Sequence, residues 1–431
     1  MQNFRLRSPL YAQIELTYAC NLACSHCYNE PRFSNENGLI QLRTVKRENT
    51  PKERFVEIAE ALARHDVFSV TLTGGEVFTV RNKLFQTAET LGRNNIDVSV
   101  NSNLTLATED DAKRLNDLGI SNVMVSLASY DPKTHDKIMG KENSHTKTLR
   151  GIELMLRNNV PVYANMVVSQ HNFSDIYQTE IFAHEMGVKG FSSAQAVPSA
   201  SGGDMHLEHA LDSEQIINYL EALNKVREDT KMPVRLTNPI AYCRVWDSHP
   251  HLRYLVETST CTAGRTTIQV DPYGEVKPCP MVSKGYGNIV DDGLDVVWQR
   301  MQEWNDDKYV PETCQPCDLV DICKGACRAE AERMEGSLDS KHTYSINPIK
   351  LTESYNLQPG TKITAEEGIR AREESQGVYT LFARNRFLTA PENVVRFVYS
   401  VKQSGGIILD ERTTNNKDAV RTISEILSSG I

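Results

Sequence analysis

Three cysteines near the N-terminus are spaced so that a single loop carries all of them. Cys20, Cys24 and Cys27 follow an apolar run, and His26 and Tyr28 flank the last of them. Cysteine thiolates are the usual ligands of [4Fe–4S] clusters, and three of them leave one iron of the cube without a protein ligand. With His26 as a fourth ligand, the same residues would instead suit one tetrahedral zinc ion. The spacing therefore predicts a metal or cluster site.

A second block holds all the remaining cysteines. No cysteine lies between residues 28 and 242 or after 327; the seven are Cys243, Cys261, Cys279, Cys314, Cys317, Cys323 and Cys327. Seven thiols exceed the ligand set of one zinc ion and suit two clusters, with two zinc sites as the alternative. Clustered cysteines in a chain without an export signal bind metal more often than they form disulfides, because the cytosol keeps thiols reduced.

Composition narrows the setting of these sites. The 431 residues carry a net charge of −9, so we expect no nucleic-acid partner and no attraction to anionic membranes. The first residues lack the apolar segment of a signal peptide, and no run of about 18 apolar residues occurs. We therefore expect a cytoplasmic protein without a membrane span, long enough for two or three domains.

The elements that must position the first cysteine loop alternate between strand-like and helix-like segments. Short runs rich in β-branched residues are the strand candidates: 11–17, 68–74, 97–103, 122–128, 161–169 and 190–198. Amphipathic stretches with helical period separate them, among them 52–65, 145–159 and 174–187. Such alternation predicts a parallel α/β sheet, either doubly wound or curved into a partial barrel. Active-site residues then belong at the carboxyl ends of the strands, where the cysteine loop falls.

The rest of the chain divides into further segments. We predict a barrel over residues 1–200, a mostly helical bridge over 201–240, a turn-rich cysteine domain over 241–345, a linker over 346–360 and a small domain over 361–431. In the last domain we expect strands at 368–375, 378–389 and 406–411, with helices from Pro391 and from about Asn416. This order predicts a winged-helix-like α+β fold.

The cysteine loop after the first strand resembles that of the radical S-adenosylmethionine (SAM) superfamily. Thr73, Gly74, Gly75 and Glu76 resemble the family's GGE motif, although Val77 stands where the family usually has proline. The resemblance covers about residues 10–200 and implies a partial (β/α)6 barrel. It also implies a [4Fe–4S] cluster on the three cysteines that cleaves SAM to methionine and a 5′-deoxyadenosyl radical, with reduced flavodoxin or ferredoxin as the electron donor.

Strand-end residues extend this resemblance to the SAM site. The residues it implies are Tyr28, Gly74, Gly75, Glu76, Asn103, Ser126, Asn165 and Gln195. Glycine at the turn permits close backbone approach and positive φ. An ordinary Gly–Gly turn and simple strand caps are the alternative interpretation of these positions. The general acid or base is not identified by the sequence.

The second cysteine block resembles the SPASM domain, an auxiliary-cluster module of peptide-modifying radical SAM enzymes. By that pattern Cys261, Cys279 and Cys327 bind auxiliary cluster I, with Cys243 as fourth ligand. Auxiliary cluster II takes Cys314, Cys317 and Cys323. No cysteine follows Cys327. The fourth position of auxiliary cluster II is therefore filled by His342 or a carboxylate such as Asp339, or it is open.

Residues 361–431 resemble the leader-recognition domains of ribosomal-peptide maturases, which implies a precursor peptide with a leader as the partner. Such domains add an extended peptide to a sheet edge. A winged-helix DNA-binding domain is disfavoured because the tail is nearly neutral. A structural cap or dimer arm is a further alternative.

Together these features predict an enzyme that modifies a precursor peptide by cross-linking, epimerisation or fragmentation. Formylglycine formation on sulfatases is a rival, but the base expected after the second SPASM cysteine is Pro280 here. A non-enzymatic iron–sulfur scaffold or redox sensor is the other alternative.

Overall fold

The structure is a computed structural model that describes residues 5–29, 33–36, 39–42, 50–197, 209–350, 359–360, 362–365, 369–375, 377–383, 386–409 and 423. The chain forms two compact units. One is Ser8–Ile349, and the other combines Met1–Arg7 with Lys350–Ile431. The larger unit contains all ten cysteines. The five domain boundaries predicted from the sequence stay predictions.

A nine-stranded sheet organises the larger unit. Its order is β11-β10-β1-β4-β5-β6-β7-β8-β9, parallel throughout except for the β10–β11 pair. The bounds are β1 (Tyr11–Glu15), β4 (Ser69–Thr73), β5 (Asp97–Ser102), β6 (Asn122–Ser126), β7 (Val162–Val168), β8 (Phe191–Gln195), β9 (Val234–Leu236), β10 (Thr267–Val270) and β11 (Val276–Lys277). The six strands predicted from the sequence are β1 and β4–β8, so the predicted α/β class is confirmed.

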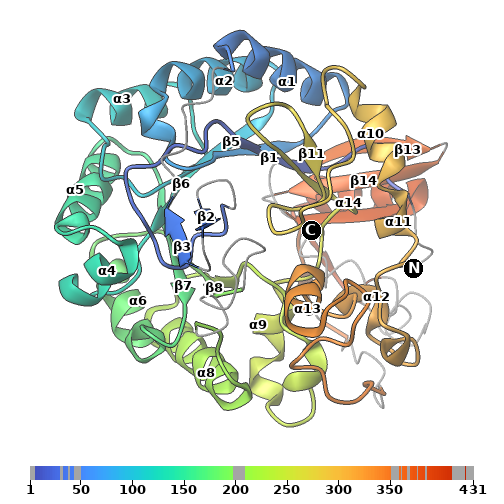
Figure 1. Ribbon diagram of the computed structural model, residues 1–431. Helices are drawn as coiled ribbons and strands as arrows, with labels where there is room; N and C mark the ends of the chain where they lie inside the picture. Colours follow the sequence, from blue (N-terminus) through green and yellow to red (C-terminus); the bar gives the residue numbers. More distant parts are fainter. Residues whose placement is uncertain are drawn as a thin grey trace. The chain divides into compact units, whose positions relative to one another are not determined.

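Helices cover the outer side of this curved sheet, as Figure 1 shows for α1–α6 and α8. They are α1 (Lys52–Arg64), α2 (Arg81–Arg93), α3 (Glu109–Asp117), α4 (Pro132–Met139), α5 (Ser144–Arg157), α6 (Ile176–Glu185) and α8 (Ser213–Thr230). In α1 the residues Phe55, Ile58 and Leu62 are fully buried, because their helical spacing places them on one face. The helix-after-strand order is that of a partial (β/α) barrel.

The inner side of the sheet is polar. Along β6, Val123 and Val125 are buried, whereas Ser126 on the alternate side is half-buried. The hydroxyl of Tyr11 donates to Thr71, whose hydroxyl shares a 2.6 Å hydrogen bond with Ser99 across three strands. Branched aliphatic side chains usually fill a closed barrel. Polar, half-buried side chains instead line a face suited to a polar ligand.

Two segments expected to lack strands contribute to the sheet. β9 lies in the segment predicted as a helical bridge, which also contains the expected helix α8. β10 lies in the cysteine block and pairs in parallel with β1. Both strands are short, three and four residues, so their period-two pattern is too brief to detect in sequence.

The cysteine block otherwise consists of short helices and turns. Its helices are α9 (Arg253–Glu257), α10 (Leu294–Arg300), α11 (Gln302–Asn305), α12 (Val320–Cys323) and α13 (Arg328–Glu335). Three 3₁₀ turns accompany them: η4 (Tyr242–Arg244), η5 (Pro250–Leu252) and η6 (Glu312–Cys314). Two further 3₁₀ turns, η2 (Val77–Thr79) and η3 (Phe173–Asp175), lie in the barrel, and β2 (Phe33–Glu36) and β3 (Leu39–Leu42) form an antiparallel hairpin.

The smaller unit contains an antiparallel sheet and one long helix. β13 (Arg370–Ser375), β14 (Val378–Ala383) and β15 (Arg386–Pro391) pair in sequence order, and α14 (Glu392–Gln403) packs on them. β12 (Lys362–Ile363) pairs with β16 (Ile407–Ile408). The single strand expected at 378–389 is wrong, because the chain turns back there into two strands. The helix expected from about Asn416 lies outside the described residues, apart from Ile423.

No helix among the residues described is both long and apolar enough to span a bilayer.

Candidate functional site

The first cysteine loop lies against the turn that follows β4. The amide of Gly75 donates to the Thr17 carbonyl at 2.6 Å, and the amide of Glu76 donates to the Ala19 carbonyl at 2.9 Å. Gly74 has φ of 137°, and a Cβ on Gly74 or Gly75 would collide with the Thr17 or Ala19 carbonyl oxygen. Glycine is therefore required at both positions, because the two backbones touch.

A second support comes from the end of α4. The amides of Ala23 and Ser25 donate to the carbonyls of Met139 and Ile138. Gly140 ends the helix with φ of 66°, and a Cβ there would meet the Ala23 carbonyl. The loop is thus fixed by backbone contacts from two sides. The left-handed cap at Gly140 is readable in sequence, but nothing in the sequence connects it to the cysteines.

Glu76 is buried and engaged by its own chain. Its carboxylate accepts hydrogen bonds from the Phe78 amide (3.0 Å), the Ser102 hydroxyl (2.8 Å) and the Asn103 amide (2.9 Å). Burial raises the pKa of this carboxyl, although the three donors oppose the shift. Its observed role is to join the β4 turn to the end of β5. A contact with the amino group of SAM stays a prediction.

The other residues predicted for SAM lie at the ends of neighbouring strands. The side-chain nitrogen of Asn103 (Nδ2) lies 4.0 Å from the Cys20 sulfur and 3.1 Å from the Asn21 side-chain oxygen. Ser126 and Asn165 are paired neighbours on β6 and β7. Tyr28 is partly buried near Thr73, and desolvation raises the pKa of its hydroxyl. The structure thus brings Asn103 to the first cysteine loop and sets Ser126 beside Asn165.

Gln195 contacts the cysteine block through its side chain. Its side-chain amide donates to the Glu330 carboxylate at 2.6 Å, and its backbone amide donates to the Asn238 side chain. Glu330 lies on α13, in the cysteine block, and is 2% exposed. The carboxyl end of β8 is therefore tied to the cysteine block by a buried charged hydrogen bond.

A second tie lies beside the first cysteine loop. The hydroxyl of Tyr18 donates to Asp271, directly after β10, and the Tyr18 ring lies 6.2 Å from that of Tyr273. Together with the β1–β10 pairing, this contact joins the barrel and the cysteine block at their polar edge. The two residues lie 253 positions apart in the chain, so no local sequence pattern predicts their contact.

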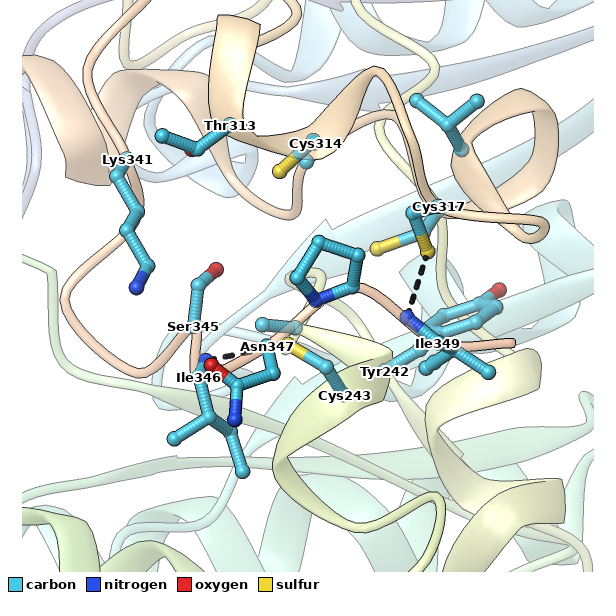
Figure 2. Close-up of a pocket in the computed structure, with 15 residues that line it drawn as sticks. Tyr242, Cys243, Thr313, Cys314, Cys317, Lys341, Ser345, Ile346, Asn347 and Ile349 are labelled. Carbon is cyan, nitrogen blue, oxygen red and sulfur yellow. Dashed lines mark hydrogen bonds between the residues drawn. The ribbon is translucent and has the colours of Figure 1, made fainter.

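Four cysteines line one pocket in the cysteine block (Figure 2). They are Cys243, Cys314, Cys317 and Cys323. The backbone amides of Ile346 and Ile349 donate to the sulfurs of Cys243 and Cys317, each at 3.3 Å. Hydrogen bonds of this kind stabilise thiolates that ligate iron. The donor set therefore fits an iron–sulfur cluster.

This arrangement differs from the predicted grouping of Cys243. The sequence pattern assigned it to Cys261, Cys279 and Cys327, whereas its pocket contains the other three cysteines of the block. The turn η4 carries Cys243, and the segment 345–349 folds back over it. Burial raises the pKa of the Cys243 thiol and the charge of Cys317 raises it further, which agrees with their proximity.

The remaining three cysteines of the block interact with one another. Burial raises the pKa of the Cys279 thiol to about 12, and the charge of Cys261 adds to the shift. Burial also raises the pKa of the Cys327 thiol well above its usual value, with contributions from Cys261 and Cys279. The grouping of Cys261, Cys279 and Cys327 as ligands of auxiliary cluster I stays a prediction.

His342 lies beside a buried carboxylate. It is buried, and its Nε2 lies 3.1 Å from Glu330 while its Nδ1 accepts from the Tyr344 amide. The residues lining the four-cysteine pocket include neither His342 nor Asp339. A role for His342 as a ligand of auxiliary cluster II stays a prediction.

Arg328 lies close to both cysteine groups. Its side chain is 1% exposed and donates to backbone carbonyls, among them those of Ser340 (2.9 Å) and Leu338 (3.1 Å). Burial lowers the pKa of its guanidinium, and the charges of Cys261, Cys327, Cys314 and Cys323 oppose that shift. The guanidinium is thus a buried positive charge available to both groups. No sequence pattern distinguishes Arg328 from the other arginines.

No three His, Cys, Asp or Glu side chains converge on a single-ion position anywhere in the part of the chain that the structure describes. An iron–sulfur cluster does not require its ligands to converge on one position, since each thiolate binds its own iron.

Two protein families match this chain. Residues 14–183 match the Radical SAM superfamily, and residues 261–318 match SPASM, described as an iron–sulfur cluster-binding domain. The chain therefore contains a Radical SAM domain and a SPASM domain, and it is a radical SAM enzyme. The predicted family and its cofactors, SAM and iron–sulfur clusters, are confirmed.

Curated relatives fall into more than one functional group. The AdoMet-dependent heme synthase of Methanosarcina barkeri is 25% identical over 79% of this chain and 97% of its own length. The antilisterial bacteriocin subtilosin biosynthesis protein AlbA of Bacillus subtilis is 26% identical over 67% of this chain and 59% of its own length.

Solved structures share the fold. SuiB of Streptococcus suis bound to SAM superposes with a TM-score of 0.62 and 18% identity, over 78% of this chain and 77% of that one. SuiB has also been solved bound to its precursor peptide SuiA, with 17% identity and the same TM-score over 80% and 77%. At this identity the likeness concerns the fold alone.

Proposed function

We propose that this protein is a peptide maturase that abstracts hydrogen from a residue of a ribosomally made precursor peptide. The relative named for subtilosin biosynthesis is the observation that carries the proposal. The structurally similar SuiB, which binds a precursor peptide, supports it. The product, whether a cross-link, an epimer or a cleaved chain, is left to the test.

In this proposal the first cysteine loop starts the reaction. A [4Fe–4S] cluster on Cys20, Cys24 and Cys27 would, with SAM, supply the 5′-deoxyadenosyl radical, and reduced flavodoxin or ferredoxin would supply the electron. Asn103 lies near the Cys20 sulfur, and the half-buried Ser126 and Asn165 lie on the inner side of the sheet. These polar side chains suit the ribose and amino-acid groups of SAM.

The proposed SAM pocket depends on backbone contacts. The glycine turn and Gly140 hold the cysteine loop against the carboxyl ends of β4 and β6, the edge where parallel α/β sheets bind ligands. Glu76 would act as a positioning residue, since it joins the turn to Asn103. All ten cysteines are free thiols, which suits a reducing, cytoplasmic setting.

The smaller unit would capture the leader. β13 and β15 each pair with β14 alone among the described strands, so both offer an edge to an added strand. An extended leader pairing there gains main-chain hydrogen bonds, and neighbouring pockets select its side chains.

The test is a comparison of full-length protein with protein lacking residues 361–431. Peptide modification, followed by mass spectrometry of the precursor, should fall below detection in the truncated protein. SAM cleavage, followed as 5′-deoxyadenosine, should persist. Modification of the precursor with unchanged KM after truncation would contradict leader capture.

Heme synthesis is the second candidate, because a heme synthase aligns over nearly its whole length with this chain. A porphyrin precursor of heme, offered in the same assay, separates the two. Heme formation without any peptide product would replace the maturase proposal.

A further inference from the structure

We propose that Cys243 is the fourth thiolate of the site formed by Cys314, Cys317 and Cys323. The site of Cys261, Cys279 and Cys327 then holds its cluster with three thiolates and one iron that takes a ligand from outside the chain. This inference rests on the proposed iron–sulfur sites and assigns a cysteine that lies outside both matched family segments.

The first argument is the shared pocket. Cys243 approaches from η4, and the other three come from the segment between η6 and α12. All four thiols line the same cavity, and Figure 2 shows Cys243, Cys314 and Cys317 around it. Ligands from two distant segments meeting in one cavity are what a structural metal site uses to fix a fold.

The second argument is the hydrogen bonding around the sulfurs. The segment 345–349 donates one amide to Cys243 through Ile346 and one to Cys317 through Ile349. One short stretch of backbone therefore serves a thiol from each segment. The backbone of Tyr242, next to Cys243, hydrogen-bonds to Cys323. Through these bonds, the backbone on both sides of the pocket contacts thiols from both segments.

The third argument is the fixed number of cysteines. The chain has ten, of which three lie in the first loop and seven in the second block. Four in one site leave three in the other. His342, which follows Cys327 in the sequence, contacts Glu330 and Tyr344.

The two auxiliary sites would then differ in chemistry. A cluster with four thiolates has no vacant iron, so it can only accept and pass on electrons, at a potential set by its hydrogen bonds and burial. A cluster with three thiolates can also bind a thiolate, an amine or a carboxylate from a substrate peptide. Glu330 and Gln195 place this second site next to the carboxyl end of β8.

The test uses the full-length protein with Cys20, Cys24 and Cys27 replaced by alanine, so that only the auxiliary clusters contribute to the spectra. Cys243→Ser is compared with Cys261→Ser as the matched control. Each protein is reconstituted with iron and sulfide and examined by iron analysis, EPR and potentiometric titration. We expect Cys243→Ser to alter the signal that Cys314→Ser alters, and Cys261→Ser to alter the other.

Pairing the substitutions makes the assignment independent of any one variant. Cys243→Ser combined with Cys314→Ser should add nothing to the loss seen for Cys314→Ser. Combined with Cys261→Ser it should affect both signals. A Cys243→Ser protein that alters the same signal as Cys279→Ser, and leaves that of Cys314→Ser intact, overturns the proposal.

A second pair of variants leaves all the cysteines in place, so it tests the assignment even where a cysteine substitution prevents folding. Ile346→Pro removes the amide that donates to Cys243, whereas Ile346→Ala keeps it. We expect the proline variant to lower the potential of the four-cysteine site only, because it loses a hydrogen bond that favours the reduced, more negative state. A shift confined to the other site would contradict the assignment.

Cyanide probes the vacant iron. Cyanide is added to the protein in which Cys20, Cys24 and Cys27 are replaced by alanine and the auxiliary clusters are present. It should shift the EPR signal of the site containing Cys261 and leave the signal of the four-cysteine site unchanged. If the signal of the Cys261 site does not change, the proposal that one of its irons lacks a ligand from this chain is wrong. These readouts need neither SAM nor peptide, so they fail separately from the proposed function: a protein that never modifies peptide can still show both signals.

Discussion

The first cysteine loop and the second cysteine block both bring cysteine thiols together, but different contacts hold the thiols in each region. The loop carries its three cysteines within eight residues, and backbone contacts to Gly75 and Gly140 fix its position. The block assembles its sites from segments between residues 243 and 349, and side chains and sulfur hydrogen bonds hold them together. Local spacing therefore defines the first site, whereas only the fold defines the others.

The largest difference should appear when one cysteine of each region is removed. Cys24→Ala should reduce SAM cleavage about a thousandfold or more, as loss of an essential group does. Cys317→Ala should leave 5′-deoxyadenosine formation within a few-fold of wild type while peptide product is lost. Parallel measurement of the two products checks this. Equal loss of SAM cleavage in both variants would mean that the regions do not act separately.

Backbone support of the loop is tested by adding a single methyl group. Gly75→Ala should displace the loop, at about 1–3 kcal/mol of overpacking, and lower SAM cleavage about a hundredfold. Gly92→Ala in α2 is the matched control, since a Cβ there meets nothing within 4 Å. The control should gain up to about 1 kcal/mol of stability and keep full activity. Comparable losses in both variants would contradict the contact argument.

A charge substitution addresses the block. Arg328→Gln removes the buried positive charge near both cysteine groups, so reduction of both auxiliary clusters should become harder. We expect both potentials to fall by tens of millivolts, where about 59 mV corresponds to a tenfold change for one electron. Arg328→Lys, which keeps the charge, is the control. A shift at one site alone would place Arg328 with that site only.

The smallest functional effect should come from Glu180, which lies outside both regions. This carboxyl is buried in α6, and burial raises its pKa well above the usual value. A raised carboxyl pKa stabilises the fold at low pH, and that contribution is lost as pH rises through the folded-state value. Glu180→Gln should therefore gain stability, on the order of 1 kcal/mol, at pH 8 but little at pH 4. Thermal unfolding at the two pH values measures it, with unchanged SAM cleavage expected.

The same contrast explains what could be predicted from sequence. The six barrel strands and the glycine turn were predictable because period and spacing are local properties of the chain. The pairing of β10 with β1 and the position of Cys243 were not, because both join segments more than 70 residues apart. The contact between His342 and Glu330 was not predictable for a related reason, because it depends on the position of α13.

The β1–β10 pairing has a consequence for synthesis of the chain. β1 is made first, but one of its two neighbours in the sheet lies at Thr267–Val270. During translation that edge of β1 stays without its partner until more than half the chain has left the ribosome, and unpaired edges invite association with other chains. Nascent chains stopped before β10 should therefore depend on chaperones, whereas chains that include it should fold unaided.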